Sequence, residues 1–511
     1  MKKIYITTPI FYVNDIPHIG HAYTSIICDT LNNFYKLMGY SVRFTTGTDE
    51  HGLKVEKAAK LSGESILEFV NKVSENFKTL TKTLQISNTD FIRTTEIRHK
   101  KAATHFWEKL YENNQIYLDK YEGWYSIKDE SFYQEKELIK KEGVYFTSDG
   151  DKVEWVEEES FFFRLSNWQN KLLKYYDENP NFIRPESRKN EVISFVKSGL
   201  KDLSISRTSF SWGIKVKDSS NHIMYVWIDA LVNYLTSINY PNLREEDISF
   251  WNNCVHVIGK DILKFHAVYW PAMLMATNLS LPKTIFAHGW WTNEGKKISK
   301  SLGNAIDPDE MINNFGLDQF KYFLLREVHL GNDGDFSKTA FINRINADLS
   351  NNLGNLIQRV IKFLNKKYTN KIPYALTISD LKIPPLKNGY NLLKKVETFV
   401  NNFEISNALK EIFDFTTILN KFVDESEPWK TIKSNPEKTE KDLTVLIESF
   451  RLLGIILRPF IPNSSRKILN MLNIKENDRD FKFFDSRYKI NKGHKINDPE
   501  PLFPKYENKD S

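Results

Sequence analysis

The first 60 residues combine two hydrophobic patterns. Residues 3–8 alternate and are rich in residue types that favour strands, so they predict a strand. Apolar residues at helical spacing predict a helix over 19–37, which Gly39 ends. A strand over 41–45 and a helix over 50–61 follow. This β-α-β-α order favours a parallel sheet with covering helices.

The pattern changes over residues 119–185, which are rich in Tyr, Trp, Glu and Lys and contain short predicted strands such as 152–156. We interpret this segment as an insertion, because the α/β pattern returns after it. The returning elements are strands over 255–258 and 284–287 and a helix over 262–276.

From about residue 341 the chain shows helical periodicity without convincing strand alternation. Apolar residues recur there at i, i+4, i+7, i+8 and i+11, as in Leu392, Val396, Phe399, Val400 and Phe403. This spacing predicts a helical bundle with apolar seams. The tail after 478 is polar and lysine-rich, and we expect it to be loosely held.

Composition excludes several classes of protein. The longest uncharged apolar run, 267–276, is about half of the ~20 residues that cross a bilayer, which excludes a transmembrane protein. The N-terminal segment lacks the apolar stretch of a signal peptide. With only Cys28 and Cys254, the chain can build neither a disulfide framework nor an all-cysteine metal site. A reducing, cytoplasmic location is therefore expected.

Positive charge is concentrated at the C-terminal end. Residues 341–511 carry 29 Lys+Arg and 21 Asp+Glu, a balance of +8, whereas the first 340 residues carry 42 and 44, a balance of −2. A basic helical region suggests a polyanionic partner such as nucleic acid. A solvated, lysine-rich bundle without such a partner would have the same composition.

The first motif that carries chemistry is Pro17-His18-Ile19-Gly20-His21, at the start of the predicted helix over 19–37. A helix N-terminus exposes backbone N–H groups and favours anions. Gly20 lets a bulky ring such as adenine approach the backbone. His18 and His21 are one helical turn apart and can donate hydrogen bonds to phosphate oxygens. Alternatively, the two histidines only cap the helix.

The second motif is Lys296-Lys297-Ile298-Ser299-Lys300-Ser301, between Gly295 and Gly303. Its three lysines and two serines offer charge and hydroxyl donors to a triphosphate. A solvated surface charge run is the alternative interpretation.

Together, the two motifs resemble the HIGH and KMSKS motifs of class I aminoacyl-tRNA synthetases. The closer resemblance is to the methionyl-tRNA synthetase family, in its bacterial type without a zinc knuckle. It is carried by the blocks PIFYVNDIPHIGHAYT, FTTGTDEHG, VWIDALVNY, VIGKDILKFHAVYWPAML and AHGWWTNEGKKISKSLGN, which stand in that family's order. The resemblance extends from residue 1 to about 462 and fades in the tail.

The resemblance implies an α/β Rossmann-like parallel-sheet catalytic domain with an inserted connective subdomain, followed by an all-α helical-bundle anticodon-binding domain. The expected parts are, in chain order, the first half of the catalytic domain (1–118), the connective insertion (119–185), the second half (186–290), the KISKS loop and stem-contact region (291–340), the anticodon-binding bundle (341–478) and the tail (479–511).

The implied reaction attaches L-methionine to tRNA(Met), initiator and elongator, through a methionyl-adenylate. The methionine carboxylate attacks the α-phosphate of ATP, supplied with Mg²⁺, and expels pyrophosphate, so positioning and charge stabilisation suffice. The implied catalytic residues are His18, His21, Lys297 and Lys300, and the implied ATP contacts are His18, Gly20, His21, Gly259, Asp261 and Lys300. Asp261 would accept hydrogen bonds from the ribose hydroxyls, or it could be the N-cap residue of the predicted helix over 262–276.

The implied methionine contacts are Tyr12, Asp49, Trp227, Ala230, Tyr234 and His288. Asp49 offers a carboxylate for the substrate ammonium, the aromatic rings surround the thioether, and His288 closes the sulfur end. Each of these aromatic residues, taken alone, is also typical of plain core packing.

Relatives with a zinc knuckle carry C-x-x-C in the insertion, where this chain has Ser126 and Asp129 at the two cysteine positions. We therefore expect no structural zinc. In the bundle, the resemblance implies that Trp429 stacks on an anticodon base and that Arg359 and Asn352 donate hydrogen bonds to it. A core tryptophan is the alternative for Trp429.

Three other functions compete with this one. The Leu, Ile and Val enzymes of class I carry large editing insertions, for which 511 residues leave no room. A small nucleotidyltransferase would not explain the KISKS motif or the helical third. A non-catalytic synthetase-like RNA-binding protein would not need His18, His21 and Lys300. We also expect a monomer without a membrane partner.

Overall fold

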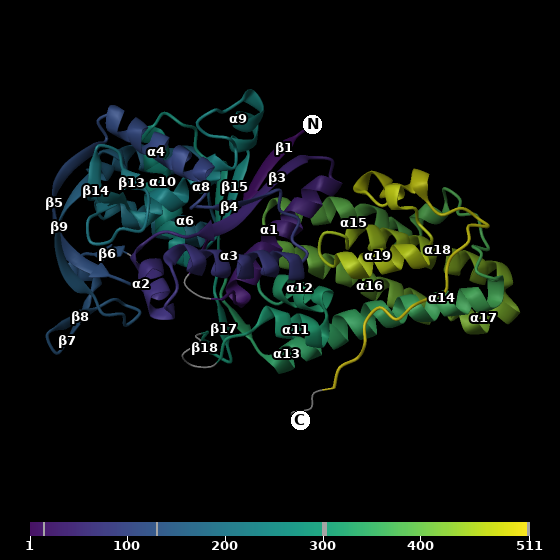
Figure 1. Cartoon of the computed structure of the whole chain (residues 1–511). Helices are drawn as coiled ribbons and strands as arrows, with labels where there is room; N and C mark the ends of the chain where they lie inside the picture. Colours follow the sequence, from purple (N-terminus) through teal and green to yellow (C-terminus); the bar gives the residue numbers. More distant parts are fainter. Residues whose placement is uncertain (14–15, 129–130, 299–303, 508–511) are drawn as a thin grey trace. The chain divides into compact units, whose positions relative to one another are not determined.

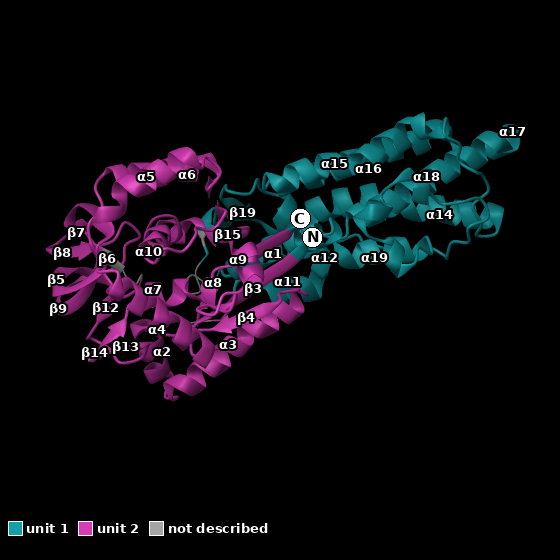
Figure 2. Ribbon diagram, turned by 90° about the horizontal axis from the view of Figure 1, so that it is seen from above, with its two compact units in different colours: residues 1–2, 18–41, 289–511 teal, residues 3–17, 42–288 magenta. Residues whose placement is uncertain are grey.

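The structure, a computed structural model, describes residues 1–13, 16–128, 131–298 and 304–507, which Figure 1 traces along the chain. The chain divides into two compact units, coloured separately in Figure 2. Residues 3–17 and 42–288 form what we call the sheet unit, and residues 1–2, 18–41 and 289–511 form what we call the helical unit.

A seven-stranded sheet lies at the centre of the sheet unit. Its order is β10-β16-β15-β1-β3-β2, and β4 also pairs with β3. The strands are β1 (Lys3–Thr7), β2 (Phe11–Tyr12), β3 (Ser41–Asp49), β4 (Asp90–Arg93), β10 (Ile183–Arg184), β15 (Cys254–Gly259) and β16 (Thr284–His288). The pairs β1–β15, β15–β16, β10–β16, β2–β3 and β3–β4 are all parallel, so the predicted parallel sheet is confirmed.

The helices of the sheet unit are α2 (Leu53–Ser62), α3 (Ile66–Thr83), α4 (Ile97–Glu112), α5 (Gln169–Glu178), α6 (Glu186–Lys197), α7 (Val226–Leu231), α8 (Asn233–Thr236), α9 (Glu245–Trp251) and α10 (Trp270–Ala276). The predicted helix over 262–276 is confirmed as a continuous helical run, but its hydrogen-bond pattern changes along it. A 3₁₀ turn (Lys260–Ile262) and a π-helical turn (Phe265–Tyr269) precede α10, which has Pro271 in its first turn. Proline has no N–H to donate within a helix, and it is tolerated at this first-turn position of α10.

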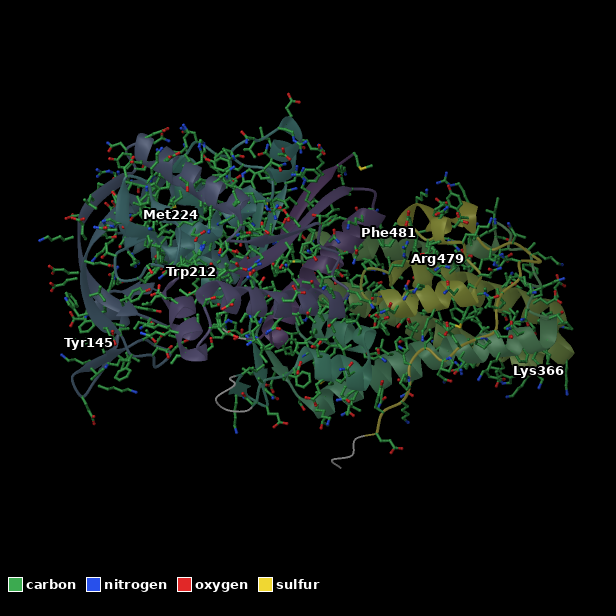
Figure 3. The ribbon with its side chains drawn as sticks, in the orientation of Figure 1. Tyr145, Trp212, Met224, Lys366, Arg479 and Phe481 are labelled. Atoms are coloured by element: carbon green, nitrogen blue, oxygen red, sulfur yellow. The ribbon has the colours of Figure 1, made fainter. Side chains whose placement is uncertain are left out.

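The insertion is built on one long antiparallel ribbon, β5 (Ile116–Ser126) with β9 (Glu154–Phe163). The expectation of short strands such as 152–156 is wrong, because the first half of β9 is largely exposed and carries no apolar alternation. β6 (Ser131–Tyr133) and β11 (Leu203–Ser204) extend this sheet. A hairpin of β7 (Ile139–Lys141) and β8 (Val144–Phe146) carries Tyr145, which Figure 3 labels. β12 (Ser206–Arg207), β13 (Lys215–Val216) and β14 (Ser219–Met224) form a separate sheet.

The helical unit contains the predicted bundle. Its helices are α1 (Ile19–Leu37), α11 (Pro308–Phe315), α12 (Leu317–Arg326), α13 (Lys338–Arg344), a π-helical segment (Ile345–Gly354), α14 (Asn355–Tyr368), α15 (Pro384–Asn401), α16 (Ile405–Ser426), α17 (Pro428–Ser434), α18 (Pro436–Ile456) and α19 (Pro462–Met471). β17 (Trp291–Asn293), β18 (Lys296–Lys297) and β19 (Gly334–Phe336) form a small sheet in this unit. No helix among the residues given above is long and apolar enough to span a membrane.

Our expectation that the tail after residue 478 is loosely held is wrong, because the tail is hydrogen-bonded to the rest of the helical unit and packed against it. Ile372 donates its backbone N–H to His494 at 3.0 Å, and Gly493 donates to the carbonyl of Ile372 at 2.8 Å. Ile496 is fully buried, and other apolar side chains of the tail are buried as well. These apolar residues, Phe481, Phe484, Ile490, Ile496 and Leu502, stand among lysines without helical or strand periodicity, so the sequence pattern did not reveal them. Figure 3 labels Phe481 on this segment.

Helix α1 has the bounds that the sequence predicts, but it belongs to the helical unit. The ammonium of Lys321 on α12 lies 3.3 Å from a carboxylate oxygen of Asp29 on α1, and both side chains are 3% exposed. The ring of Phe34 packs edge-on against Phe481, with ring centroids 5.2 Å apart. Contacts therefore attach this helix to the C-terminal part of the chain, although we expected it to belong with residues 1–118.

Candidate active site and nucleic-acid interface

The two histidines of the first motif cap α1. His18 is the N-cap residue, and its Nδ1 accepts a hydrogen bond from the backbone N–H of Gly20 at 3.0 Å. The backbone N–H of His18 donates to Nδ1 of His21 at 3.1 Å. Because both Nδ1 atoms accept, each neutral ring carries its proton on Nε2. Capping thus uses Nδ1 of each ring and puts the N–H of a neutral ring on Nε2.

Gly20 is required by the neighbouring histidine ring. A Cβ atom at this position would lie 2.9 Å from Cε1 of His18, which is closer than side chains allow. The rings of His18 and His21 lie with centroids 4.0 Å apart. The absence of a side chain at Gly20 thus leaves room for the His18 ring at the first turn of α1, beside the ring of His21.

The second motif begins on β18. Lys296 and Lys297 pair in antiparallel fashion with Asn293 and Thr292 of β17. Gly295 has φ of +72° at the turn between the two strands. The residues of the motif that follow, Ser299, Lys300 and Ser301, with Gly303, lie outside the described residues. The structure therefore places the backbone of Lys297 and leaves the role of Lys300 a prediction.

The predicted ATP residues of the sheet unit lie at the carboxyl end of β15. Gly259 ends this strand and stands opposite His288 of β16. A Cβ atom at Gly259 would collide with Oδ1 of Asp261 and would lie 3.9 Å from Cε1 of His288. Gly259, not Asp261, occupies the N-cap position of the turn that follows, so the alternative role of Asp261 as N-cap is wrong. The structure thus brings Gly259, Asp261 and His288 together.

The predicted methionine residues come from three places in the sheet unit. Tyr12 of β2 and Asp49 of β3 are direct neighbours in register, and Asp49 is buried. Trp227 and Ala230 lie on α7, and Tyr234 lies on α8. Tyr234 is 1% exposed, and its carbonyl accepts a hydrogen bond from the Tyr5 hydroxyl at 3.1 Å.

His266, which sequence reasoning missed, contacts Tyr234. The Tyr234 hydroxyl lies 2.7 Å from Nε2 of His266, and Nδ1 of His266 lies 3.0 Å from the carbonyl of Ile262. A carbonyl only accepts, so Nδ1 donates and Nε2 accepts from the tyrosine. Burial lowers the pKa of His266 to about 4, which keeps the ring neutral.

Phe265 and His266 also contact Trp227. The rings of Trp227 and Phe265 stack with centroids 3.8 Å apart and 9° between their planes, and His266 lies edge-on to Trp227 at 6.3 Å. These two residues stand in the block VIGKDILKFHAVYWPAML. A histidine in an otherwise apolar run was the available signal, because a buried histidine needs partners for both ring nitrogens.

The predicted anticodon residues lie on the helical unit. Trp429 follows Pro428 in the first turn of α17 and is 43% exposed, so the core alternative is wrong. Nη2 of Arg359 on α14 donates to Oδ1 of Asn420 at 3.1 Å and lies 3.3 Å from Oδ1 of Asp424. The amide of Asn420 in turn donates to Oδ1 of Asn352 at 2.7 Å. Asn352 and Arg359 are thus joined through Asn420, which sequence reasoning missed.

Of the two residues at the cysteine positions of the zinc knuckle, the structure describes one. Ser126 is buried at the end of β5, whereas Asp129 lies outside the described residues. Within the described part of the chain, no three His, Cys, Asp or Glu side chains are grouped so that they could hold a metal ion. The expectation of no structural zinc stays a prediction.

Comparison with known proteins shows the family. Residues 4–361 match the family described as tRNA synthetases class I (M), and residues 386–511 match the anticodon binding domain of methionyl tRNA ligase. A methionine–tRNA ligase of Rickettsia felis is 50% identical over 506 residues, 98% of either chain. A methionine–tRNA ligase of Brucella suis is 45% identical over 506 residues, 99% of this chain and 98% of the relative.

A solved structure agrees with these relatives. The Mycobacterium tuberculosis methionyl-tRNA synthetase in complex with methionyl-adenylate is 42% identical and superposes with a TM-score of 0.96, covering 99% of this chain and 100% of that chain. The fold agrees with this, since His18 caps α1, the pairs of the central sheet are parallel and the C-terminal part is helical. This chain therefore belongs to the methionyl-tRNA synthetase family of class I aminoacyl-tRNA synthetases.

Proposed function

We propose that this chain attaches L-methionine to tRNA(Met), both initiator and elongator, in an ATP-dependent reaction that passes through methionyl-adenylate and releases AMP and pyrophosphate. The observation that carries the proposal is the cap of α1, in which the Nδ1 atoms of His18 and His21 both accept hydrogen bonds, so that a neutral ring has its N–H on Nε2. Two fixed donors at a helix N-terminus are suited to phosphate oxygens.

Adenylate formation needs no nucleophile from the protein. A carboxylate oxygen of methionine attacks the α-phosphorus of ATP, and the bond to the β-phosphate breaks. His18 and His21 donate to phosphate oxygens, while Lys297, Lys300 and the Mg²⁺ that accompanies ATP neutralise the departing pyrophosphate. Because the imidazoles are held by backbone hydrogen bonds, little reorganisation is needed as charge develops.

The nucleoside and the amino acid are each assigned a set of contacts. Gly20 and Gly259 allow close approach of the adenosine, and Asp261 accepts hydrogen bonds from the ribose hydroxyls. Asp49 pairs with the substrate ammonium next to Tyr12. Trp227, Ala230 and Tyr234 enclose the thioether.

His266 supports this thioether pocket by fixing the Tyr234 hydroxyl. His288 closes the pocket at the sulfur end, and it stands opposite Gly259 in the register of β15 and β16.

Transfer to RNA follows. A ribose hydroxyl at the 3′ end of the tRNA attacks the carbonyl carbon of the adenylate, and AMP leaves. Trp429 stacks on an unpaired anticodon base, since half-exposed aromatic rings bind RNA loops in this way. Arg359 and Asn352, linked through Asn420, add hydrogen bonds.

We further propose a cytoplasmic monomer without structural zinc, in which the buried Cys28 and Cys254 stay as thiols. Light scattering should give a mass near 59.9 kDa, and metal analysis of purified protein should give no stoichiometric zinc.

The experiment that tests the function is ATP–pyrophosphate exchange with each of the twenty amino acids. We expect methionine to support exchange far better than the other nineteen. Exchange supported best by another amino acid, or by none, would reject the proposal.

A further inference from the structure

A fully buried carboxylate lies between two of the predicted methionine residues in the sequence. Asp229 follows Trp227 by two positions on α7 and directly precedes Ala230, and its side chain is 0% exposed. Its Oδ2 lies 2.6 Å from Nδ1 of His51, and its Oδ1 lies 2.7 Å from Nε2 of His99. Both carboxylate oxygens are thus bound by imidazole nitrogens, which a buried charge requires.

The two histidines keep this carboxylate ionised. Burial by itself raises the pKa of Asp229, but the charge and hydrogen bonds of His51 and His99 outweigh burial and lower this pKa to about 2. A carboxylate only accepts hydrogen bonds, so Nδ1 of His51 and Nε2 of His99 both donate to it.

His51 connects the carboxylate to the segment that carries Asp49. This segment, which continues β3, is held on other sides too. The buried carboxylate of Glu50 accepts from Nε of Arg93 at 2.6 Å, and the carbonyl of Glu50 accepts from the indole of Trp212 at 2.6 Å. The Trp212 ring, labelled in Figure 3, meets His51 edge-on at 5.6 Å. Because His51 is two residues from Asp49, its hydrogen bond to Asp229 restrains the same segment from a further side.

His99 connects the same carboxylate to α8. Nδ1 of His99, on α4, lies 3.0 Å from the hydroxyl of Thr236, two residues after Tyr234. The carboxylate is thus shared between the segment of Asp49 and the helices of Trp227, Ala230 and Tyr234.

We propose that Asp229 is a positioning residue for methionine: its carboxylate, held by His51 and His99, keeps the ammonium-binding Asp49 in fixed register with the aromatic pocket on α7 and α8. This inference rests on the proposed function. An amide at position 229 cannot replace the carboxylate, because its one oxygen can accept from one histidine while its NH₂ group faces the N–H of the other.

The test measures ATP–pyrophosphate exchange of the full chain while methionine and ATP are varied separately. For Asp229→Asn we expect KM for methionine to rise roughly 10–100-fold, the usual effect of removing a hydrogen bond to a charged group, with KM for ATP within about threefold of the unaltered enzyme. A purely structural role would lower the active fraction, and hence the apparent kcat, and leave both KM values unchanged.

The histidine partners give a second, independent measurement. Gln at position 99 can place an amide N–H near the Nε2 position, and Asn at position 51 can do so near the Nδ1 position. We expect His99→Gln and His51→Asn to keep KM for methionine within about threefold of the unaltered value, whereas His99→Leu and His51→Leu raise it as Asp229→Asn does. These pairs decide the question if Asp229→Asn does not fold.

Asp247 provides the matched control. It is also 0% exposed in the sheet unit, and it pairs with Arg43 at 2.8 Å and Arg244 at 2.9 Å. Asp247→Asn is the same chemical change, and we expect it to lower stability with both KM values unchanged.

The inference is overturned if Asp229→Asn leaves KM for methionine unchanged, if Asp247→Asn raises it equally, or if the Gln and Leu variants at position 99 are indistinguishable. Each of these outcomes requires an unaltered enzyme that is active with methionine. Absence of methionine-dependent exchange in the unaltered enzyme would instead reject the proposed function itself.

Discussion

The hydroxyl of Tyr234 donates a 2.7 Å hydrogen bond to Nε2 of His266. The second ring nitrogen of His266 donates to the carbonyl of Ile262, so the tyrosine hydroxyl can donate only while the imidazole is neutral. The position of a side chain that we assign to the methionine pocket therefore depends on the protonation of a buried histidine.

This dependence predicts a loss of stability in acid. Burial lowers the pKa of His266 to about 4, below the ordinary value of 6.5, so between these pH values the unfolded chain binds a proton that the folded chain does not. The free energy of unfolding must then fall as pH falls through this window. From about pH 7.5 to about pH 5, His266 contributes a loss of about 2 kcal/mol.

Denaturant unfolding of the unaltered chain and of His266→Gln measures this contribution. Glutamine has no titration in the window, so we expect the variant to lose about 2 kcal/mol less over the same pH range. Equal losses in the two proteins would contradict the neutral, buried imidazole.

Replacement of His18 should separate its two roles. Asparagine is a good N-cap residue, so His18→Asn retains an acceptor for the first turn of α1 but removes the Nε2–H donor. We expect the free energy of unfolding to change by no more than about 1 kcal/mol, while kcat for ATP–pyrophosphate exchange falls about 100-fold or more. A variant that keeps full exchange activity would show that this histidine only caps the helix.

Removal of the exposed tryptophan should affect tRNA alone. Trp429→Ala should reduce the rate of tRNA charging strongly, because stacking on a base contributes about 1–3 kcal/mol, while exchange stays within about twofold of the unaltered rate. Tyr488→Ala is a suitable control, since Tyr488 is 46% exposed in the same unit, close to the 43% of Trp429. Loss of exchange in a folded Trp429→Ala protein would defeat the anticodon assignment.

Arg359 allows a finer measurement on the same surface. Arg359→Lys keeps the charge but loses the planar fork that donates toward Asn420 and Asp424. We expect KM for tRNA to rise about tenfold or more, with exchange unchanged. Arg458, whose Nη1 donates to Asp480 at 2.9 Å in the same unit, provides the matched control Arg458→Lys, for which KM for tRNA should not change.

The elements that the sequence predicted well are those with signals at both ends. The bounds of α1 were predicted correctly, because Pro17 and His18 mark its start and Gly39 marks its end. The strand β9 was predicted too short, since its exposed first half has no apolar alternation and is defined by pairing with β5.

The candidate site likewise contains residues that a local sequence signal predicts and residues that have no such signal. Short motifs allow candidate residues to be predicted, but they do not identify partners that meet only through folding. Asp229 is 178 positions from His51 and 130 from His99, and no local pattern connects them. The place of His288 opposite Gly259 likewise follows from the register of β15 and β16, which the order of motifs does not specify.

The buried pair of Asp29 and Lys321 has a consequence for how the two ends of the helical unit are connected. It fastens the helix of His18 and His21 to α12, and α12 meets α16 through the rings of Tyr322 and Phe413, 4.8 Å apart. The helix α16 runs directly into the turn that presents Trp429. The helix end that we assign to phosphate binding and the turn that we assign to the anticodon are therefore connected through packed helices of one compact unit.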